Sequence, residues 1–446
     1  PDMVVIAVRA VGTVTVIQRV VGADSVFSYT SDIAALNGAI TTTGGSGQRS
    51  ATLVAAGAHS LSVADARGAG YAVTSISCND TDSVVNLAGR SVAIALSPNE
   101  NLVCTVTSTN TRDAATVAIR NFLTARNAAI LAAKPDVQRR LDRLAGTAPS
   151  GGSASAFGLP VPGSGHLPLS LTASDGQVRA SASLGMARAA LGDADRGPTK
   201  LDIWTEASFA SLDYPGHKGR FSIIYAGADY RASDKLLIGG LVQFDSFSPQ
   251  GGMTAGAVKG HGWMAGPYLM AKIGPNLYAD LRAAWGKSTN SVSPLGSFVD
   301  GFSTSRSLYS GSLIGQFDIG KRTQIRPEIT IRYLDEKQKS YIDSLGVAIP
   351  GQSVGQGDIS FRPRIHHDVT LSETWTLRPY AEAEGIYTFG LDRQSVFGKR
   401  FRMRIEGGAD LFATNGIRAS LSAFHDGIGS AGYKSTGGRV TLSIGF

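Results

Sequence analysis

The carboxy-terminal half of the chain alternates apolar and polar residues with a period of two, and this pattern limits the fold more than any other feature. Successive side chains of a β-strand point to opposite faces, so each such segment has one apolar face and one polar face. In the segment 324–333, for example, Ile329 and Ile331 alternate with Glu328, Thr330 and Arg332. The same alternation recurs in the segments 279–285, 359–366, 375–384, 401–406 and 439–446. The pattern predicts a sheet of antiparallel strands.

A soluble β-sandwich would alternate in the same way, but three features favour a membrane barrel. Many of the runs are about ten residues or longer, which suits a tilted strand that crosses the hydrocarbon layer. Pro327, Pro363 and Pro379 lie on the apolar face, which is unusual in a packed sandwich core. The polar face mixes Arg with Glu and has few Lys residues, as expected of ion pairs in a confined space. We therefore predict a mostly β protein with a transmembrane β-barrel whose apolar residues contact lipid.

The alternating segments predict an antiparallel barrel of twelve strands, and bacterial barrels have even strand numbers. The connections alternate between short turns, expected on the periplasmic side, and longer loops, expected outside the cell. The predicted strands are 201–210, 220–230, 235–245, 260–272, 276–288, 303–318, 322–337, 357–370, 374–389, 399–412, 415–427 and 432–446.

The polar face of these strands is predicted to line the barrel lumen. Glu382 and Glu384 share this face and could form an acid–base pair, but the arginines on the same face favour ion pairing instead. The candidate lumen residues are Asp202, Glu206, Asp280, Arg282, Arg326, Glu328, Arg332, Arg362, Arg364, Arg378, Glu382, Glu384, Arg402, Arg404 and Glu406.

The residues before the barrel divide into four regions. Short β-rich runs separated by Gly, Asn, Asp and Ser turns predict a β-sandwich over 1–111, of the immunoglobulin-like or prealbumin-like kind. Residues 112–145 have a helical pattern, which Pro135 divides into two helices. Residues 146–183 are rich in Gly, Ser and Pro and are predicted to be a linker, which contains two alternating runs, 168–172 and 177–182, around Asp175 and Gly176. The region 184–200 contains a short Ala-rich helix, which we expect to lie in the lumen.

Composition and local motifs indicate no catalytic or cofactor function. The net charge is +7, but no cluster of Lys and Arg interleaves with aromatic residues, so nucleic acid is not an expected partner. Neither a Gly-x-Ser-x-Gly turn nor a phosphate-binding loop is present. His366 and His367 could suggest a metal site, but adjacent strand residues point to opposite faces. Asn79, Asp80 and Asp82 could hold calcium in a loop, but a solvated polar turn is favoured. We expect no enzyme activity, no cofactor and no metal site.

The two cysteines, Cys78 and Cys104, both lie in the predicted sandwich. In an exported protein this favours a disulfide, which would stabilise the fold by roughly 3 kcal/mol; two buried free thiols are the alternative. The sequence contains no run of eighteen apolar residues, so no transmembrane helix is predicted. The sequence begins at Pro1 without a signal peptide, so we expect a mature or truncated form of an exported chain.

Several segments resemble the translocator barrels of autotransporters, the type V secretion proteins of Gram-negative bacteria. They are Leu201–Glu206, Trp263–Tyr268, Asp280–Gly286 and Gly438–Phe446. The resemblance implies an outer-membrane barrel with a helix in its lumen and a passenger displayed at the cell surface. It also implies that Phe446 belongs to the signal read by the barrel-insertion machinery.

The segments Gly70–Cys78 and Asn101–Thr107 resemble bacterial prealbumin-like surface modules, and this resemblance implies that Cys78 and Cys104 pair. We interpret the chain as a secretion and display anchor with an extracellular module of adhesion or interaction type. Outer-membrane lipid, the insertion machinery and an unidentified surface ligand are the expected partners. A porin-like pore and a barrel enzyme are the alternative functions.

Overall fold

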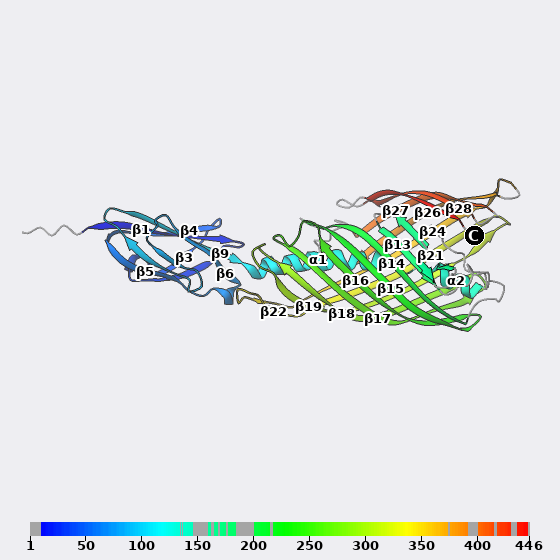
Figure 1. The fold of residues 1–446 in the computed structure, drawn as a ribbon, viewed down its shortest axis with the longest axis horizontal. Helices are drawn as coiled ribbons and strands as arrows, with labels where there is room; N and C mark the ends of the chain where they lie inside the picture. Colours follow the sequence, from blue (N-terminus) through cyan, green and yellow to red (C-terminus); the bar gives the residue numbers. More distant parts are fainter. Residues whose placement is uncertain are drawn as a thin grey trace, which may run out of the picture.

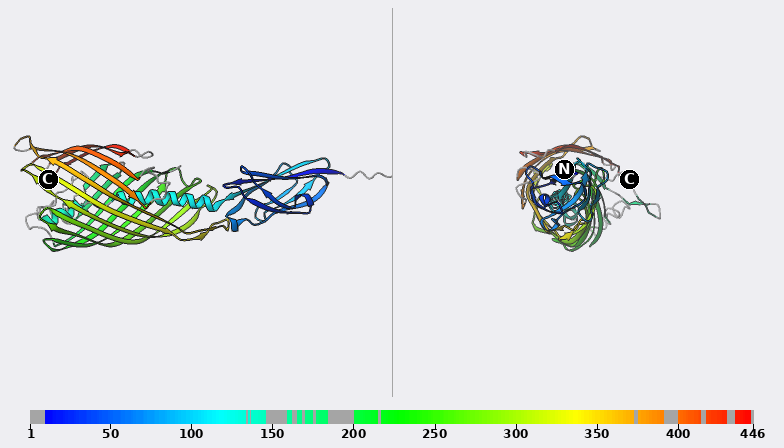
Figure 2. Two further views of the ribbon diagram at one scale, coloured as in Figure 1. Left: turned by 180° about the vertical axis from the view of Figure 1, so that it is seen from behind. Right: turned by 90° about the vertical axis from the view of Figure 1, so that its left-hand side faces the viewer.

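The computed structural model contains an amino-terminal β-sandwich and a larger β-barrel, arranged end to end (Figures 1 and 2). A helix runs from the sandwich into the barrel. The structure describes residues 10–133, 135, 137–145, 159–161, 165–167, 170–174, 177–183, 200–214, 217–372, 375–390, 400–413, 417–429 and 435–444.

The sandwich packs two sheets, of strand order β4-β1-β9-β6 and β3-β2-β5-β8-β7, around its own core. Alternation of Val with polar residues in β1 buries Val14 and Val16 against the facing sheet. The elements are β1 Val11–Val21, β2 Val26–Ser31, η1 Ala34–Leu36, β3 Gly38–Thr41, β4 Ser46–Ala55, β5 Gly57–Val63, η2 Arg67–Ala69, β6 Tyr71–Cys78, β7 Val84–Asn86, β8 Ser91–Leu96 and β9 Asn101–Asn110.

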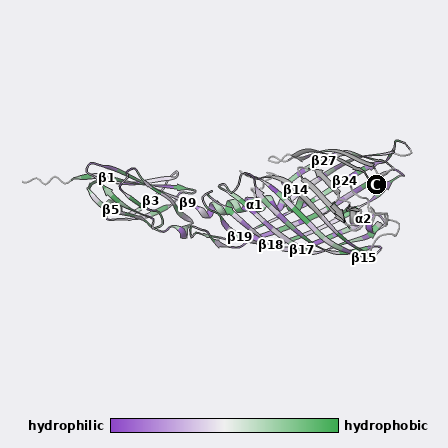
Figure 3. Cartoon of the chain, viewed as in Figure 1, coloured by the Kyte–Doolittle hydropathy of each residue, from purple (hydrophilic) through white to green (hydrophobic). Residues whose placement is uncertain are grey.

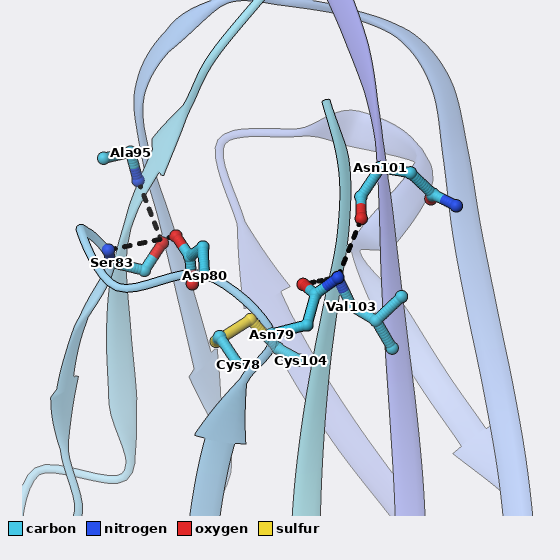
Figure 4. The surroundings of a disulfide bond; sticks show 8 residues. All are labelled: Cys78, Asn79, Asp80, Ser83, Ala95, Asn101, Val103 and Cys104. Atoms are coloured by element: carbon cyan, nitrogen blue, oxygen red, sulfur yellow. Dashed lines mark hydrogen bonds between the residues drawn. A yellow bond between two sulfur atoms is a disulfide. The ribbon is translucent and has the colours of Figure 1, made fainter. Parts of the chain in front are cut away.

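A disulfide joins Cys78 at the end of β6 to Cys104 in β9 (Figure 4). The two cysteines are direct partners in the antiparallel register of these strands, so the bond connects neighbouring positions of one sheet. Next to it, the Asn79 side chain accepts a hydrogen bond from the Val103 backbone N–H (2.7 Å). These bonds fix the end of β6 to β9.

Two helices follow the sandwich, α1 Thr111–Ala132 and α2 Gln138–Ala145. α1 begins where the Asn110 side chain accepts a hydrogen bond from the Asp113 backbone N–H (3.0 Å), an N-cap that satisfies one free donor of the first turn. Its many alanines favour a helix, and Pro135 separates it from α2. No helix in the described part of the chain combines the length and apolar character needed to cross a membrane.

Twelve long strands form an antiparallel barrel in which each strand pairs with its neighbours in sequence. Short turns, such as the one between β15 and β16, bring consecutive strands together as antiparallel hairpins. The strands are β14 Leu201–Tyr214, β15 His217–Ser233, β16 Leu236–Pro249, β17 Ala257–Gly274, β18 Leu277–Ser293, β19 Asp300–Gly315, β21 Thr323–Gln338, β24 Gln352–His367, β26 Trp375–Phe389, β27 Phe401–Ala413, β28 Ile417–Ile428 and β29 Ser435–Ile444.

Several strands extend beyond the predicted bounds at the barrel end that faces the sandwich. β18 continues to Ser293, and β24 begins at Gln352 rather than 357. Here strand pairing continues past the region in which one face is apolar, so the alternation that predicts strands has already ended. The smaller elements of the barrel region are β10 Leu159–Val161, β11 Gly165–Leu167, β20 Phe317–Ile319, β22 Tyr341–Ile342, β23 Ala348–Ile349 and β25 Val369–Thr370.

The two faces of the barrel strands differ as the alternation predicts. In β21, Ile329 and Ile331 are about half exposed on the outside, at 49% and 50%. Glu328 and Thr330 between them are each only 2% exposed. Figure 3 shows hydrophobic and hydrophilic residues interspersed along the strands. In β21 the outer face is thus apolar and the inner face polar, the arrangement that a strand in lipid requires. On β15–β17, apolar residues such as Ile223 and Met264 are also buried on the inner face, in one core with α1.

The structure differs from the sequence analysis in the region 146–183. Residues predicted as linker form β12 Ser170–Ser174 and β13 Gln177–Ser183, and β13 pairs with β14. β12 in turn lies against β29, so these short strands join the two ends of the sheet. The alternation at 168–172 and 177–182 indicates two extended runs, but so few residues do not reveal that these runs join the barrel sheet. The helix predicted at 184–191 and the terminal Phe446 lie outside the described residues.

Candidate functional site

The barrel lumen contains α1, which enters from the sandwich and runs along the barrel axis (Figure 1). Its 22 residues correspond to about 33 Å at 1.5 Å per residue, close to the thickness of a hydrocarbon layer. Phe122 and Leu123 are fully buried, and the Phe122 ring contacts the Phe247 ring of β16 edge to face, with centroids 5.3 Å apart. The helix therefore packs against the inner wall.

Arg126 of α1 is fully buried and bonds to three polar residues of the wall. It forms an ion pair with Glu336 of β21 and donates hydrogen bonds to Asn290 Oδ1 (2.6 Å) and Ser288 Oγ (3.0 Å) of β18. Its guanidinium also lies over the Phe122 ring, 4.3 Å from the centroid. A single helix residue thus connects α1 to two barrel strands.

A second buried arginine completes this cluster. Arg306 of β19 donates to Glu336 Oε1 (3.0 Å) and to Asp245 Oδ1 of β16 (2.6 Å). Together with Arg126, this gives two arginines and two carboxylates with no net charge. The cost of desolvating each ion is therefore offset by a neighbour of opposite sign. Removing one member would leave an uncompensated charge in a dry environment. We call Arg126, Asp245, Arg306 and Glu336 the central charge cluster.

The end of α1 is also fixed by hydrogen bonds from the wall. The last carbonyl groups of a helix have no partner within the helix. Here the Tyr225 hydroxyl donates to the Ala133 carbonyl (2.7 Å), and Arg332 Nη1 donates to the Leu131 carbonyl (2.8 Å). Arg332 also pairs with Asp358 through its Nε (2.7 Å). The wall supplies the donors that water would supply to a free helix.

α2 forms ion pairs with the opposite end of the lumen. Arg140 pairs with Asp280 of β18 (3.0 Å), and Arg143 pairs with Asp229 of β15. Both arginines are 4% exposed. Both arginines of α2 therefore bond to the barrel wall.

The predicted lumen residues follow the inward alternation of their strands wherever their side chains are described. Asp202, Asp280, Glu328, Arg332 and Glu406 are buried. The half-buried ones are Arg282, Arg326, Arg362, Arg364, Arg378, Glu382, Glu384, Arg402 and Arg404. The side chain of Glu206 lies outside the described part.

Many of these residues pair along the wall rather than with the helix. Arg362 pairs with Glu328 (2.5 Å) and lies 3.7 Å from Glu382, which Arg364 also approaches (3.8 Å). Arg404 pairs with Glu406 (2.8 Å). Ion pairs thus join β24 to β21 and to β26, and β27 has a pair of its own, so this part of the polar face compensates its own charges.

Three members of the central charge cluster, Asp245, Arg306 and Glu336, lie on predicted strands but are not among the candidate residues. The clearest sequence signal for the cluster is Arg126. It lies between Phe122 and Ile130 at a spacing of four, on the apolar face of the helix. A charged residue on a buried face needs a partner, so this position indicates that α1 enters a polar environment.

The sandwich contacts the barrel through a hairpin between β21 and β24. This junction hairpin, residues 339–351, contains β22 and β23. Val347 and Ile349 are buried against Ala72 of β6 and Ala115 of α1. Arg112 Nε donates to the Ala348 carbonyl (3.0 Å). The module is thus held against one end of the barrel.

The turn expected to be solvated contains an acidic group of the sandwich. Oxygen atoms of Asp80, Asp82 and Glu100 lie within 4.8 Å of one another. Asn79 does not join them, because its side chain bonds to Val103 and to the Asn101 carbonyl (3.0 Å).

His367 lies on the exposed side of its strand and bonds to Thr323 (2.6 Å).

Comparison with known proteins gives two family matches. Residues 203–423 match the autotransporter β-domain, and residues 14–111 match a prealbumin-like fold domain. No curated protein gives a significant sequence match.

Solved structures similar to this chain include three autotransporter domains. The β-domain of the Bordetella autotransporter BrkA is 16% identical, with 56% of this chain and 100% of that chain covered and a TM-score of 0.40. The translocator domain of NalP from Neisseria meningitidis is 18% identical, with coverages of 58% and 93% and a TM-score of 0.36. The transport unit of AIDA-I from Escherichia coli is 11% identical, with coverages of 66% and 95% and a TM-score of 0.32.

Proposed function

We propose that this chain is an outer-membrane translocator that displays an amino-terminal passenger, because residues 203–423 match the autotransporter β-domain, and that the sandwich of residues 10–110 is held outside the cell. The observation that carries this proposal is the path of α1. It joins the sandwich directly to the lumen, so the sandwich must lie at the barrel end through which the helix emerges.

The lengths of the connections support this orientation. At the barrel end next to the sandwich, β18 joins β19 and β21 joins β24 through 6 and 13 residues between the strand bounds. At the opposite end, β15 joins β16 and β17 joins β18 through two residues each. Outer-membrane barrels have short periplasmic turns and longer extracellular loops. The sandwich therefore lies at the end with the extracellular type of connection.

We further propose that the lumen has two successive roles. Its polar wall admits an extended chain during export, and the central charge cluster then holds α1 in place. The ion pairs of Glu328 and Glu382 with Arg362 and Arg364 compensate one another without the helix, so this part of the wall does not depend on α1 for neutrality. The helix then closes the lumen after the passenger has crossed.

For the sandwich itself we propose a binding role at the cell surface. Leu53 is 79% exposed and has a positive φ of 57°, a strained conformation for a leucine. An exposed apolar side chain on a strained backbone is a candidate contact with a partner. Replacing Leu53 with Asn should relieve the strain and weaken adhesion of expressing cells to the surface that the wild type binds.

Epitope tags in two exposed turns test the orientation. One tag is inserted at Gly44–Gly45 in the sandwich and the matched control at Gly320–Lys321, between β20 and β21. Antibody should label the first tag on intact cells and the second only after the outer membrane is permeabilised. Labelling in the reverse order would overturn the proposed orientation, and labelling of neither tag on intact cells would place the sandwich inside.

A further inference from the structure

The junction hairpin contains two buried carboxylates with no counter-ion. Asp300 at the start of β19 is 7% exposed and Asp343 in the hairpin is 5% exposed. No Lys or Arg in the described part of the chain forms an ion pair with either residue. This contrasts with the lumen, where Asp245, Asp280 and Glu336 each pair with an arginine. Two buried like charges without a cation are strongly unfavourable.

Local hydrogen bonds bring the two carboxylates together and use one oxygen of each. Asp300 Oδ1 accepts from the Ser344 backbone N–H (3.0 Å), which places it beside the residue that follows Asp343. Asp343 Oδ1 accepts from the backbone N–H groups of Leu345 (3.0 Å) and Val347 (2.7 Å). The second oxygen of each carboxylate, Oδ2, is buried and has no hydrogen-bond donor among the described residues.

Tyr341 adds a third buried oxygen at the same place. Its ring stacks on Phe302, two residues after Asp300 on the same face of β19, with centroids 6.3 Å apart. Its hydroxyl is buried and also without a partner in the described part of the molecule. Burial foremost, and then the negative charges of Asp300 and Asp343, raise the pKa of Tyr341. The three groups therefore lie within electrostatic reach of one another.

We propose that Asp300 and Asp343, with Tyr341 beside them, bind a divalent cation of the Ca²⁺ type. A charge of +2 neutralises both carboxylates, and Ca²⁺ takes oxygen ligands in irregular geometry with water completing its shell. Mg²⁺ requires a near-octahedral arrangement, which a hairpin of this kind does not supply. Sites in extracellular modules bind Ca²⁺ with dissociation constants of about 10⁻⁴–10⁻³ M, and we expect that range here.

The bound cation would attach the junction hairpin to β19 and so stiffen the contact between module and barrel. Asp300 belongs to the barrel wall, whereas Val347 and Ile349 of the same hairpin pack against the sandwich and α1. The inference does not depend on which side of the membrane the sandwich occupies. It concerns only how the two bodies are joined.

Terbium luminescence with the full chain in detergent micelles tests the site. Tb³⁺ replaces Ca²⁺ at such sites and emits when a nearby tyrosine is excited, here Tyr341. The D300N/D343N variant retains every Oδ1 hydrogen bond but loses both charges. We expect Ca²⁺-displaceable emission from the wild type and at least a tenfold loss of that emission in this variant.

The acidic group Asp80, Asp82 and Glu100 of the sandwich provides the matched control. The D80N/D82N variant should retain the emission of the wild type. Loss of emission in D80N/D82N with retention in D300N/D343N would assign the cation to the sandwich and overturn the proposal. Absence of Ca²⁺-displaceable emission from the wild type would overturn it as well.

Trypsin cleavage after Lys339 gives a second measurement that needs no folded variant. Lys339 is exposed at the start of the hairpin, and its backbone N–H donates to the Ser303 carbonyl (3.0 Å). Ca²⁺ should slow cleavage of the wild type and of D80N/D82N at least threefold. An equal cleavage rate with Ca²⁺ and with chelator would contradict the proposal even if D300N/D343N failed to fold.

Discussion

At the scale of single residues, basic side chains of the sandwich and of the barrel differ in whether their charge depends on pH. His59 of the sandwich bonds through both ring nitrogens, Nδ1 to Asp32 (2.8 Å) and Nε2 to the Ala55 carbonyl (2.7 Å). Both partners are acceptors, so both nitrogens must carry a proton, and the pKa of His59 is raised first by the Ala55 carbonyl and then by Asp32. In the central charge cluster, by contrast, the arginines are permanently charged and carboxylates of the wall fix their positions.

The His59 contact predicts a pH dependence of the sandwich. A raised folded-state pKa gives stability that is fully present below the unfolded-state pKa of about 6.5 and lost as pH rises through the folded-state value. The melting temperature of residues 10–110 should therefore fall as the pH rises above about 6.5. A His59→Gln variant should show a weaker dependence over that range. Parallel curves for the two proteins would show that His59 does not contribute.

Ile329 tests the outward face. It is half exposed near the middle of β21, between the inward Glu328 and Thr330. An arginine at the bilayer midplane costs ~2–4 kcal/mol, so Ile329→Arg should reduce barrel assembly. Assembly is measured by heat-modifiable migration in electrophoresis, with Ile329→Leu as the control. Normal assembly of Ile329→Arg would mean that this face does not contact lipid.

At the scale of elements, α1 combines the properties of a soluble helix and a lumen plug. Its Ala-rich sequence forms a helix readily, but its buried face carries Arg126, which only the barrel wall can neutralise. The barrel strands carry the carboxylates that pair with the arginines of the helices. Their polar faces pair with one another across β21, β24 and β26, and they keep Glu336 and Asp280 for the helices.

The grip on α1 can be tested by truncating Arg126. Breaking a buried pair costs ~3–5 kcal/mol, and the lower end is expected because Arg306 still pairs with Glu336. Arg126→Ala should therefore leave the barrel folded but loosen the helix, measured as faster hydrogen exchange of residues 111–132. Arg120→Ala is the matched control, since Arg120 is exposed on the same helix and donates to Gln352 (3.3 Å). Equal exchange in both variants would argue against the central charge cluster as the anchor.

At the scale of the whole molecule, the sandwich, the helix and the barrel are connected in sequence and in space. The sandwich has its own core and disulfide, and the barrel has its own closed sheet. They are joined by α1 through the lumen and by the junction hairpin at its mouth. This arrangement keeps the module close to the membrane in a defined orientation.

Closure of the lumen by α1 predicts the conductance of deletion variants in planar bilayers. Removing residues 1–145 takes away both described helices and should give open channels. Removing residues 1–110 takes away only the sandwich and should leave conductance near the level of the full chain. Open channels after the smaller deletion would indicate that the sandwich, and not α1, closes the barrel.

The fold follows from the sequence to the extent that its signals are local. Alternation with period two assigns Ile329 to the outside and Glu328 to the inside without any knowledge of the neighbours. The apolar heptad-like spacing and Pro135 likewise give two helices after the sandwich. The alternation at 168–172 and 177–182 is visible in the sequence, but the place of these runs in the barrel sheet is not. The pairing of β13 with β14 and the contact of β12 with β29 depend on the rest of the sheet.

The amino-acid sequence by itself determined the two faces of the barrel, the order of its strands and the sandwich that precedes them, because side-chain periodicity is a property of a few consecutive residues. Only the tertiary structure decided that α1 occupies the lumen and that Arg126 meets Glu336, 210 residues away in sequence. Ion pairing depends on distances across a closed barrel, and those distances exist only after all strands have found their neighbours.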